Sequence, residues 1–545
     1  MPGASALGSG MRVRTMLFAL VLPVTLGAQA TVTVPVQDPV YRDLDLLFGS
    51  GVIKTMIVGQ RPYSRREIAR ITLDASKTPP TRPLSERNRR ILDRLKREYA
   101  PEINALRGDT TSMQRFVLNQ GRAELLGTNS PSRAIPRDGT GAIDADVNPL
   151  LNGRAGRVYR VGTNVALDAD MSFRAARSLI FRVDPRVIGN VDGSGTFTQG
   201  SLEAASMTWL VKDIAIEVGR QQLVWGQGME GGLLGSTSGL PLDMLRIATD
   251  TPFFLYKLGP ARGTFMVTDL GPNQHFPHSN IIAYKLSGNP FVSRFELSAS
   301  VMSEQGGKGA PAATFLDNLV DVVPALKYTL HSKNRGQFSN KFAGWEYRLR
   351  VPELSGLQLY AEHQFDDMDP RRWRSTLWED AGHIFGFSLA QLGAESNLST
   401  ALEFHHTGIR YYKHTPFESG ITFNRTLIGD PLGNQADGWY WRTMWDDGRA
   451  SSFTFDAALE RRAGDDYNAL VDGVPPDETN FRFVKVVNRA DEFRRRVGMT
   501  WMYRPSAHWR ATASAAYERA LNYAFVDGAS RNGFMLSTSM ELIQW

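Results

Sequence analysis

The stretch "FMLSTSMELIQW" (residues 534–545) alternates apolar and polar side chains, which is the period-two pattern of a β-strand with one apolar face. The residues that share this face are Phe534, Leu536, Thr538, Met540 and Leu542. The alternation slips after Leu542, which a β-bulge would absorb, and the stretch ends on Trp545. Such a strand with an aromatic last residue is typical of the closing strand of an outer-membrane β-barrel, so we expect one here.

The same alternation recurs upstream of this stretch. The longest run is "WRATASAAYERALNYAF" (509–525), and shorter ones occupy 160–171, 343–351, 357–362 and 496–503. Further runs lie near 291–301, 402–412 and 453–461. Each run has an apolar and a polar face over about ten residues, which is the pattern of lipid-facing and lumen-facing positions in a transmembrane barrel.

The connections between these runs differ in length. "VPELSG" (351–356) and "RPSAHW" (504–509) are short, whereas 303–325, 366–380 and 463–480 are long and polar. Short turns at one rim and long loops at the other are typical of outer-membrane barrels, and Trp and Tyr near the run ends indicate an aromatic girdle.

We therefore predict a mostly-β fold, a large antiparallel transmembrane β-barrel over residues 157–545. At roughly 20–25 residues per strand and connection, this length gives about 18 strands, with 16 as the alternative. A secreted β-sandwich or propeller would alternate in the same way. However, a sandwich of this length would need several domains, and we find no propeller-type repeat.

Composition limits the kinds of site and partner. The 545 residues include no Cys, which excludes disulfides and thiolate metal sites and suits a cell-envelope compartment. The net charge of +6 is small for this length, so we expect no nucleic-acid partner.

The first thirty residues resemble a secretory signal. "MRVRTMLFALVLPVTLGAQA" (11–30) has two arginines, an apolar run from Met16 to Leu26, and a small-x-small end at Ala30. We predict a signal peptide over 1–30, with Met1 or Met11 as the start. An N-terminal membrane anchor is the alternative, but the run is short for a span and no other stretch reaches eighteen apolar residues. A mature chain that resides in a membrane must then cross it as a closed barrel.

Residues 31–127 show helical rather than alternating periodicity. Leu44, Leu47 and Phe48 share a helix face before Gly49, and Ser64 precedes Glu67 in a capping-box pattern. "LSERNRRILDRLKREYAPEINAL" (84–106) has one apolar and one Arg-rich face and contains a helix-breaking Pro101. We predict a small periplasmic helical domain over 31–127. Residues 128–156 are rich in Gly, Pro, Asn and Asp, so we expect a linker or loop there.

Motifs for catalysis or cofactor binding are weak. "GQGMEGG" (226–232) has the glycine spacing of a dinucleotide site, but no amphipathic helix follows to hold a phosphate, so we interpret it as a Gly-rich loop. The pairs His275/His278 and His405/His406 lack a nearby acidic pair, and no serine-hydrolase elbow occurs. We therefore predict no catalytic residue, no metal site and no cofactor.

Two clusters mix Trp with Arg and Asp, the residue types that recognise sugars through aromatic faces and hydrogen bonds to hydroxyls. They are "DDMDPRRWRSTLWED" (366–380) and "DGWYWRTMWDDG" (437–448). The candidate polysaccharide-binding residues are Trp373, Trp378, Trp439 and Trp441. The alternative for any single Trp is a place in the aromatic girdle.

The chain as a whole resembles the Wzi capsule assembly family. The resemblance rests on "VYRDLDLLFGSGVI" (40–53), "RPYSRREIAR" (61–70), "GRQQLVWGQGMEGGLLGS" (219–236) and "LPLDMLRIATDTPF" (240–253), and on the order of helical domain and barrel. It implies an 18-stranded barrel, a periplasmic helical bundle near its mouth and a lectin-like role without catalysis. Arg220 and Trp225 lie in the matching motif, and we add them to the candidate binding residues.

We therefore predict a monomeric, non-enzymatic outer-membrane protein that binds capsular or surface polysaccharide and helps to assemble or anchor it. Its expected partners are outer-membrane lipid, the polysaccharide and the outer-membrane assembly machinery. The alternative is a porin-like channel for small anionic or sugar solutes. The arginines that would line such a channel are Arg348, Arg350, Arg496 and Arg510. An outer-membrane hydrolase is a third option that no motif supports.

Overall fold

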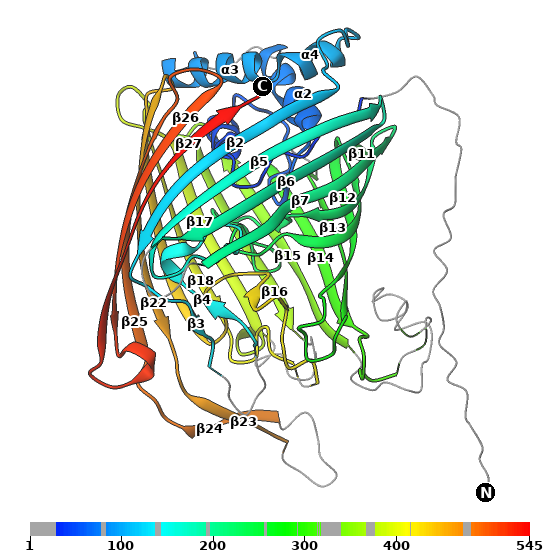
Figure 1. The fold of residues 1–545 in the computed structure, drawn as a ribbon. Helices are drawn as coiled ribbons and strands as arrows, with labels where there is room; N and C mark the ends of the chain where they lie inside the picture. Colours follow the sequence, from blue (N-terminus) through cyan, green and yellow to red (C-terminus); the bar gives the residue numbers. More distant parts are fainter. Residues whose placement is uncertain are drawn as a thin grey trace, which may run out of the picture.

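A computed structural model shows one closed barrel with a group of helices across one end (Figure 1). The structure describes residues 29–77, 83–136, 143–191, 197–255, 259–290, 293–312, 314, 317, 339–366, 377–414, 416–471 and 481–544. Most of the predicted signal peptide, Trp373 and the terminal Trp545 lie outside these residues. No described helix is long and apolar enough to cross a membrane.

The barrel has 18 antiparallel strands, which confirms the predicted fold class and strand number. The strands are β2 (Phe116–Thr128), β5 (Gly162–Ala176), β6 (Leu179–Asn190), β7 (Phe197–Val211), β8 (Ile214–Gln221), β10 (Leu242–Thr249) with its continuation β11 (Phe253–Leu255), β12 (Gly259–Asp269), β13 (Asn280–Gly288), β14 (Phe295–Gln305), β15 (Ser339–Val351), β16 (Leu357–Asp366), β17 (Ala381–Leu392), β18 (Leu398–Thr407), β21 (Ala436–Asp446), β22 (Ser451–Arg462), β25 (Glu492–Tyr503), β26 (Trp509–Leu521) and β27 (Ser530–Ile543). The last strand, β27, pairs with the first, β2, and closes the sheet.

The first barrel strand lies earlier in the chain than we predicted. We expected the barrel to begin at residue 157 and the helical domain to extend to residue 127, but β2 pairs with β5 as well as β27. A bulge between Leu118 and Gln120 interrupts the alternation of β2, and Leu126 faces inward although it is apolar. These two features hide the period-two pattern in β2.

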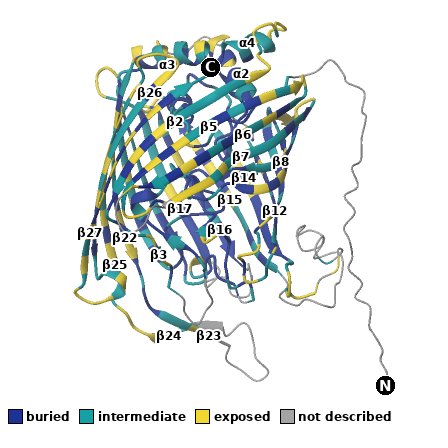
Figure 2. Ribbon diagram, in the orientation of Figure 1, coloured by how far each residue is buried: buried dark blue, intermediate teal, exposed yellow. Residues whose placement is uncertain are grey.

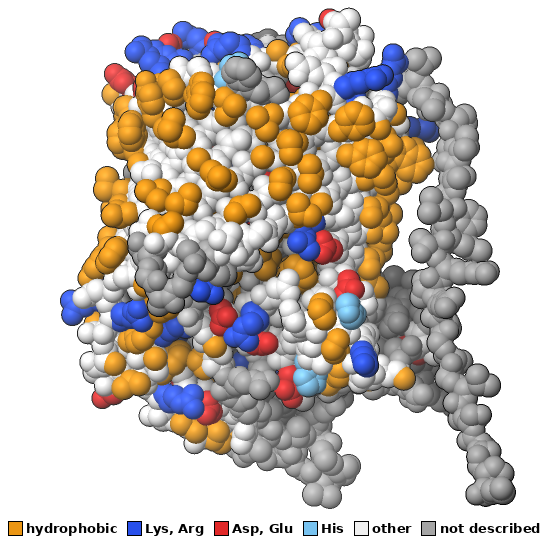
Figure 3. Space-filling view, viewed as in Figure 1, with side chains coloured by type: hydrophobic (Ala, Val, Ile, Leu, Met, Phe, Trp, Pro, Cys, Tyr) orange, Lys and Arg blue, Asp and Glu red, His pale blue; other side chains and the backbone are white. Residues whose placement is uncertain are grey.

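Side chains alternate between the two faces of the wall. On β27, Leu536 and Met540 are 59% and 60% exposed on the outside, whereas Ser537 and Ser539 are buried inside. Figure 2 shows this alternation as stripes along the strands, and Figure 3 shows the resulting apolar band on the face in view. The outer face is therefore built to contact lipid.

The two ends of the barrel differ, as predicted. Connections at the end that carries the helices are short, as at 177–178, 352–356, 447–450 and 504–508; we call this the helical end. The connections at the opposite, loop end include 129–161, 222–241, 306–338, 408–435 and 463–491. The chain's last described residues lie at the helical end (Figure 1).

Four helices form the predicted helical domain. They are α1 (Val40–Gly49), α2 (Arg65–Lys77), α3 (Glu86–Glu98) and α4 (Ala100–Leu106). The Ser64 hydroxyl accepts a hydrogen bond from the backbone N–H of Glu67 (3.0 Å), as the capping pattern predicts. Pro101 lies in the first turn of α4, which follows the break at Tyr99. The helices pack around a shared apolar core that also contains Ala390 and Met444 of the barrel, so the domain is seated on the barrel mouth.

The N-terminal chain also enters the lumen. Residues 52–64 descend from the helical end, and the short strand β1 (Gln60–Arg61) pairs with β9 (Val224–Trp225) of the connection 222–241, which rises from the loop end. Glu296 on the inner wall accepts hydrogen bonds from the backbone N–H groups of Val58 and Gly59, at 2.8 and 2.9 Å. We call residues 52–64 and 222–241 together the plug.

The Gly-rich loop belongs to this plug and is not a phosphate site. Gly226 has a φ of 143°, and a Cβ there would lie 2.2 Å from the Cα of Gly232. A Cβ on Gly232 would in turn lie 2.2 Å from the carbonyl oxygen of Trp225. The glycines therefore allow two backbone segments to touch inside the barrel.

The segment 128–156, predicted to be a linker or loop, is a connection between β2 and β5 that folds back into the lumen. It contains β3 (Arg133–Ala134), β4 (Asp146–Val147) and the 3-10 turn η1 (Pro149–Leu151). The connection 408–435 holds β19 (Thr422–Phe423) and β20 (Thr426–Leu427). The segment 128–156, the plug and this connection together form a buried apolar core inside the barrel. The core residues include Ile135, Ile143, Trp225, Leu233, Phe342, Tyr411, Tyr412 and Ile421. The remaining short elements are β23 (Asp466–Val471), β24 (Phe481–Val487) and η4 (Tyr523–Phe525).

Replacing Arg350 by Met is expected to loosen the N-terminal segment. The buried guanidinium donates to the carbonyl oxygens of Phe48 (2.7 Å), Ile53 (2.5 Å) and Lys54 (3.0 Å). Losing these donors leaves buried carbonyls unpaired, which costs about 2–4 kcal/mol. Urea unfolding and proteolysis of the helical domain measure the loss. The control Arg294→Met removes an exposed pair with Glu353 and is expected to cost less than about 1 kcal/mol; equal losses would contradict the role of Arg350.

A second prediction concerns Asp43 of α1, which is fully buried. Its carboxylate lies 2.8 Å from the guanidinium of Arg94 in α3 and 3.4 Å from that of Arg504 at the barrel rim. Burial alone would raise its pKa, but the guanidinium groups of Arg94, Arg504 and Arg42 lower the pKa to about 2. A carboxylate whose pKa is lowered by folding stabilises the fold by about 2 kcal/mol at pH values above its unfolded pKa, which is about 4. This stabilisation is lost as the pH falls towards 2.

Asp43→Asn is therefore expected to reduce the free energy of unfolding at pH 7, and the gap to the wild type should narrow between pH 5 and pH 2. Denaturant titrations across this range measure it. A gap that stays constant with pH would show that Asp43 does not act through its charge.

Candidate functional site

A chamber of about 450 Å³ lies inside the barrel, between the plug and the wall formed by β21, β22, β25, β26, β27 and β2. Gln37 and Pro39 of the N-terminal chain border it, as do residues of the connections 129–161, 222–241 and 408–435. The chamber is thus bordered by segments that come from both ends of the barrel.

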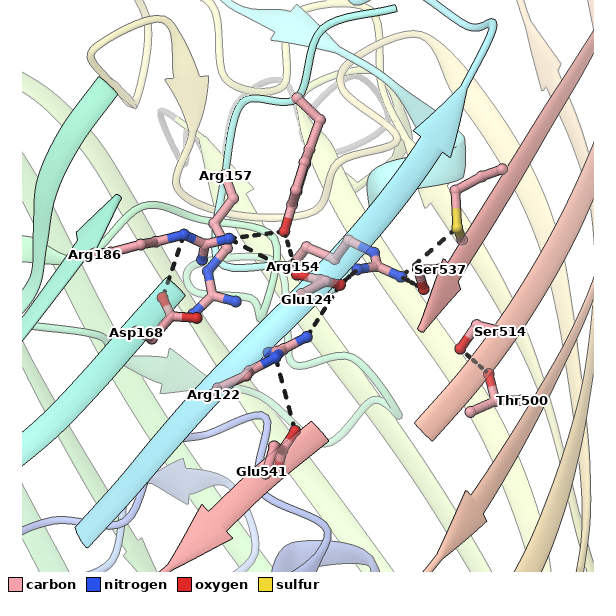
Figure 4. A network of polar contacts seen from close by, with 12 residues as sticks. Arg122, Glu124, Arg154, Arg157, Asp168, Arg186, Thr500, Ser514, Ser537 and Glu541 are labelled. Carbon is pink, nitrogen blue, oxygen red and sulfur yellow. Dashed lines mark hydrogen bonds and ion pairs between the residues drawn. The ribbon is translucent and has the colours of Figure 1, made fainter. Parts of the chain in front are cut away.

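The chamber exists because the wall carries small side chains at this place. The inward-facing residues are Gly498 and Thr500 on β25, Thr512, Ser514 and Ala516 on β26, and Ser539 on β27. Thr500 and Ser514 hydrogen-bond each other at 3.1 Å (Figure 4). Elsewhere on the wall, inward residues such as Phe342 and Arg350 are large and contact the internal segments directly.

One edge of the chamber is a network of arginines and carboxylates (Figure 4). Arg154 of the connection 129–161 donates to Glu124 (2.5 Å) and to the hydroxyl of Ser537 (2.9 Å). Arg122 pairs with Glu124 at 3.1 Å and faces Glu541 at 3.7 Å. Arg154 therefore holds the connection against the wall, and the network presents guanidinium groups to the chamber.

The opposite edge centres on Arg442 of β21. Its guanidinium donates to Glu230 of the plug (2.5 Å) and to Asp456 of β22 (2.6 Å). Burial would raise the pKa of Glu230, but Arg442 and the hydroxyl of Thr237 lower it, so Glu230 stays ionised. The side chains of Arg442, Glu230 and Asp456 are 33%, 44% and 37% exposed, so each can still contact a ligand.

A third group adds an aromatic face to the chamber. The Tyr440 ring lies 4.6 Å from the His405 ring, centroid to centroid. His405 is held between Asp430 (2.5 Å) and Glu403 (3.0 Å). Glu403 also accepts a hydrogen bond from the backbone N–H of Met229 at 2.7 Å, which connects the plug to this side of the wall.

The chamber has nearly balanced charge and many hydrogen-bonding groups. Its basic residues are Arg122, Arg154, Arg157, Arg442, Arg496 and Arg510, and its acidic residues are Glu230, Glu403, Asp430, Asp456 and Glu541. Such a lining can donate to and accept from a ligand rich in hydroxyl groups, with Tyr440 as a stacking face. Among the described residues, no group of three or more His, Asp or Glu side chains is placed to hold a metal ion.

The candidate residues from the sequence do not meet in this chamber as a group. Trp439 and Trp441 are 50% and 48% exposed, with side chains on the outward face of β21, and Arg220 pairs on the outside with Asp243 of β10 (2.5 Å). Trp225 is 1% exposed in the plug, where Lys285 lies 5.9 Å from its ring centroid. These side chains lie in the plug or on the outward face, although Trp441 also borders the chamber. A binding role for these residues stays a prediction.

The remaining two candidates belong to the connection 367–380. Trp378 is 51% exposed at the loop end and stacks on His406, with ring centroids 3.8 Å apart. Trp373 lies outside the described residues.

The sequence held a signal for the residues that do line the chamber. Within "DGWYWRTMWDDG", alternation places Tyr440 and Arg442 on the face opposite to Trp439 and Trp441. The inward face therefore carried the chamber residues while the prominent tryptophans faced lipid. Arg154 and Glu230 also line the chamber, but no sequence signal indicates this, because loops that fold into a lumen have no periodic pattern of apolar and polar residues.

Comparisons with known proteins agree with this architecture. A solved Escherichia coli protein, Wzi, described as an outer-membrane carbohydrate-binding β-barrel involved in group 1 capsule assembly, superposes with a TM-score of 0.65 at 16% identity over 95% of this chain and 99% of that chain. OprD from Pseudomonas aeruginosa (TM-score 0.41, 9% identity, 80% and 96% covered) and OccAB2 from Acinetobacter baumannii (0.40, 10%, 79% and 98%) are less similar. The comparison with curated proteins gave no match.

The sequence model of the family described as capsule assembly protein Wzi matches residues 138–533, which is well over half of the chain. The resemblance seen in the sequence is thereby confirmed. The chain belongs to the Wzi family of capsule assembly proteins.

Proposed function

We propose that this protein binds capsular or surface polysaccharide without enzymatic action and helps to assemble or anchor it at the cell surface. The observation that carries the proposal is the polar chamber, in which Tyr440, Arg442 and Asp456 stand beside the plug residue Glu230. The solved Escherichia coli barrel of the same fold is described as carbohydrate-binding, which supports a carbohydrate ligand here.

The size and chemistry of the chamber fit a short stretch of sugar. Its volume of about 450 Å³ lies within the range of small-ligand sites. Each hydroxyl of a sugar both donates and accepts, and the chamber offers guanidinium donors next to carboxylate acceptors. A neutral or mildly acidic saccharide therefore matches the lining better than a strongly charged polyanion does.

We place the helical domain in the periplasm and the loop end outside the cell. Short turns at the helical end and long connections at the other end support this orientation. The chamber then lies beneath connections 129–161, 222–241 and 408–435, on the side where exported polysaccharide would arrive. We propose a monomer because β2 and β27 close the sheet within one chain. We also propose that the outer-membrane assembly machinery recognises the closing strand β27.

The porin-like alternative fits the described lumen less well. Arg348 and Arg350 donate to backbone carbonyls of the plug and of the segment 48–54. Arg496 pairs with Glu460 (3.1 Å), and Arg510 pairs with Glu541. These arginines are therefore occupied with internal partners, which favours a binding role over solute passage.

Filling the chamber from the wall tests the proposal. Ser514→Phe places a ring in the chamber, whereas Ala513→Phe, one residue earlier on β26, places the same ring on the lipid-facing side. Ser514→Phe is expected to weaken binding of oligosaccharides from the organism's own surface polysaccharide by about tenfold or more, because a filled site loses its hydrogen bonds. Calorimetric titration of the refolded proteins measures this, and Ala513→Phe should bind like the wild type.

Equal binding by both variants would contradict the chamber as the site. Mass spectrometry of the recovered oligosaccharide is expected to show an unchanged mass after long incubation. Cleavage or modification of the sugar would instead show an enzyme.

A further inference from the structure

The outer wall carries two arginines that stand directly opposite each other. Arg495 on β25 and Arg519 on β26 are register partners, and both are exposed on the outward face near the loop end. Directly opposed residues of an antiparallel pair have Cβ atoms about 4.5–5.5 Å apart, and like charges in such a pair repel each other. The wall thus keeps an arrangement that disfavours its own pairing.

No carboxylate offsets these charges. Among the described residues, neither Arg495 nor Arg519 takes part in an ion pair or a side-chain hydrogen bond. Other outward arginines near this end are paired: Arg461 binds Asp437 (2.7 Å) and Arg220 binds Asp243 (2.5 Å). The lack of partners thus distinguishes Arg495 and Arg519 from these two arginines.

The neighbouring residues would complete an anion site. On β27, Asn532 is the register partner of Arg519 and is exposed on the same face. The Tyr517 hydroxyl donates to its amide oxygen at 2.9 Å, which turns the amide N–H groups away from the tyrosine. Two guanidinium groups and one amide thus face outward together as donors.

The surroundings identify the kind of anion. One step towards the middle of the wall, the outward residues are Val497, Tyr517 and Phe534, which are 46%, 45% and 49% exposed, followed by Met499 and Leu536. Figure 3 shows basic side chains gathered directly below the apolar band on the side of the barrel formed by β25–β27. The cationic group therefore sits at the edge of the lipid-facing surface, where lipid headgroups lie.

We propose that Arg495, Arg519 and Asn532 form a binding site for the phosphate group of a membrane lipid, whose acyl chains lie along the adjacent apolar wall. Guanidinium groups bind phosphate through paired, charge-assisted hydrogen bonds, which a single phosphate can accept from both arginines. The lipid phosphate would then replace the missing carboxylate and remove the repulsion between the two arginines.

Native mass spectrometry of the refolded mature chain in neutral detergent, titrated with dioleoyl phosphatidate or dioleoyl phosphatidylcholine, tests the proposal. The wild type is expected to retain phosphatidate about tenfold more tightly than phosphatidylcholine. Arg519→Gln should remove most of this preference, whereas Arg220→Gln, which deletes an equally outward but paired arginine, should leave it unchanged. A loss of preference in both variants, or in neither, would overturn the site.

Arg519→Glu gives a second readout that a purely structural role would not produce. The new carboxylate would pair with Arg495, so the unfolding midpoint is expected to rise while the phosphatidate preference disappears. A variant that is stabilised and still prefers phosphatidate would overturn the proposal. Inorganic phosphate is added in a separate arm: a lipid site keeps its phosphatidate at millimolar phosphate, and full displacement would show a free-phosphate site instead.

Discussion

The pairing of β2 with β27 is the constraint on which the rest of the structure depends. It closes the sheet, so the backbone groups of these two strands pair with each other and the described wall presents no open strand edge to lipid. Closure also fixes the alternation of side chains, which sends apolar residues out and charged residues into the lumen, where many of them are buried. Those buried charges then need partners of their own.

The plug supplies these partners through its backbone. Inward carboxylates accept plug N–H groups: Glu296 from Val58, Glu362 from Leu233, and Glu403 from Met229. Inward arginines donate to plug carbonyls, as Arg348 does to Gln227. The wall and the plug therefore satisfy each other, and because β1 and β9 pair in the middle, segments from the two ends become one internal body. Where the wall carries small residues this mutual contact stops, and the chamber remains.

The sequence predicted the barrel better than its contents. Strands with a clean period of two, such as β26 and β27, were recognisable because one face contacts lipid and the other does not. β2 was missed because its bulge and inward Leu126 disturb that period. The helices of the N-terminal domain were predicted from Ser64 and the apolar face before Gly49, since helix caps and faces are local signals.

The site was hardest to predict because it is assembled from distant loops. Arg154, Glu230 and Asp430 meet strand residues far away in the chain, and their loops carry no periodic pattern. The tryptophans that drew attention, Trp439 and Trp441, are conspicuous in sequence because lipid-facing girdles favour them. Their inward neighbours Tyr440 and Arg442 share the same stretch, so the prediction identified a strand that lines the chamber but named its outward residues.

The measurement that tests this account most directly is single-channel conductance of the refolded full-length protein in planar bilayers. If residues 52–64 and 222–241 fill the lumen as described, the protein inserts without a steady current. A stable, ion-selective current from the intact chain would contradict the plugged lumen and, with it, a chamber bounded by the plug.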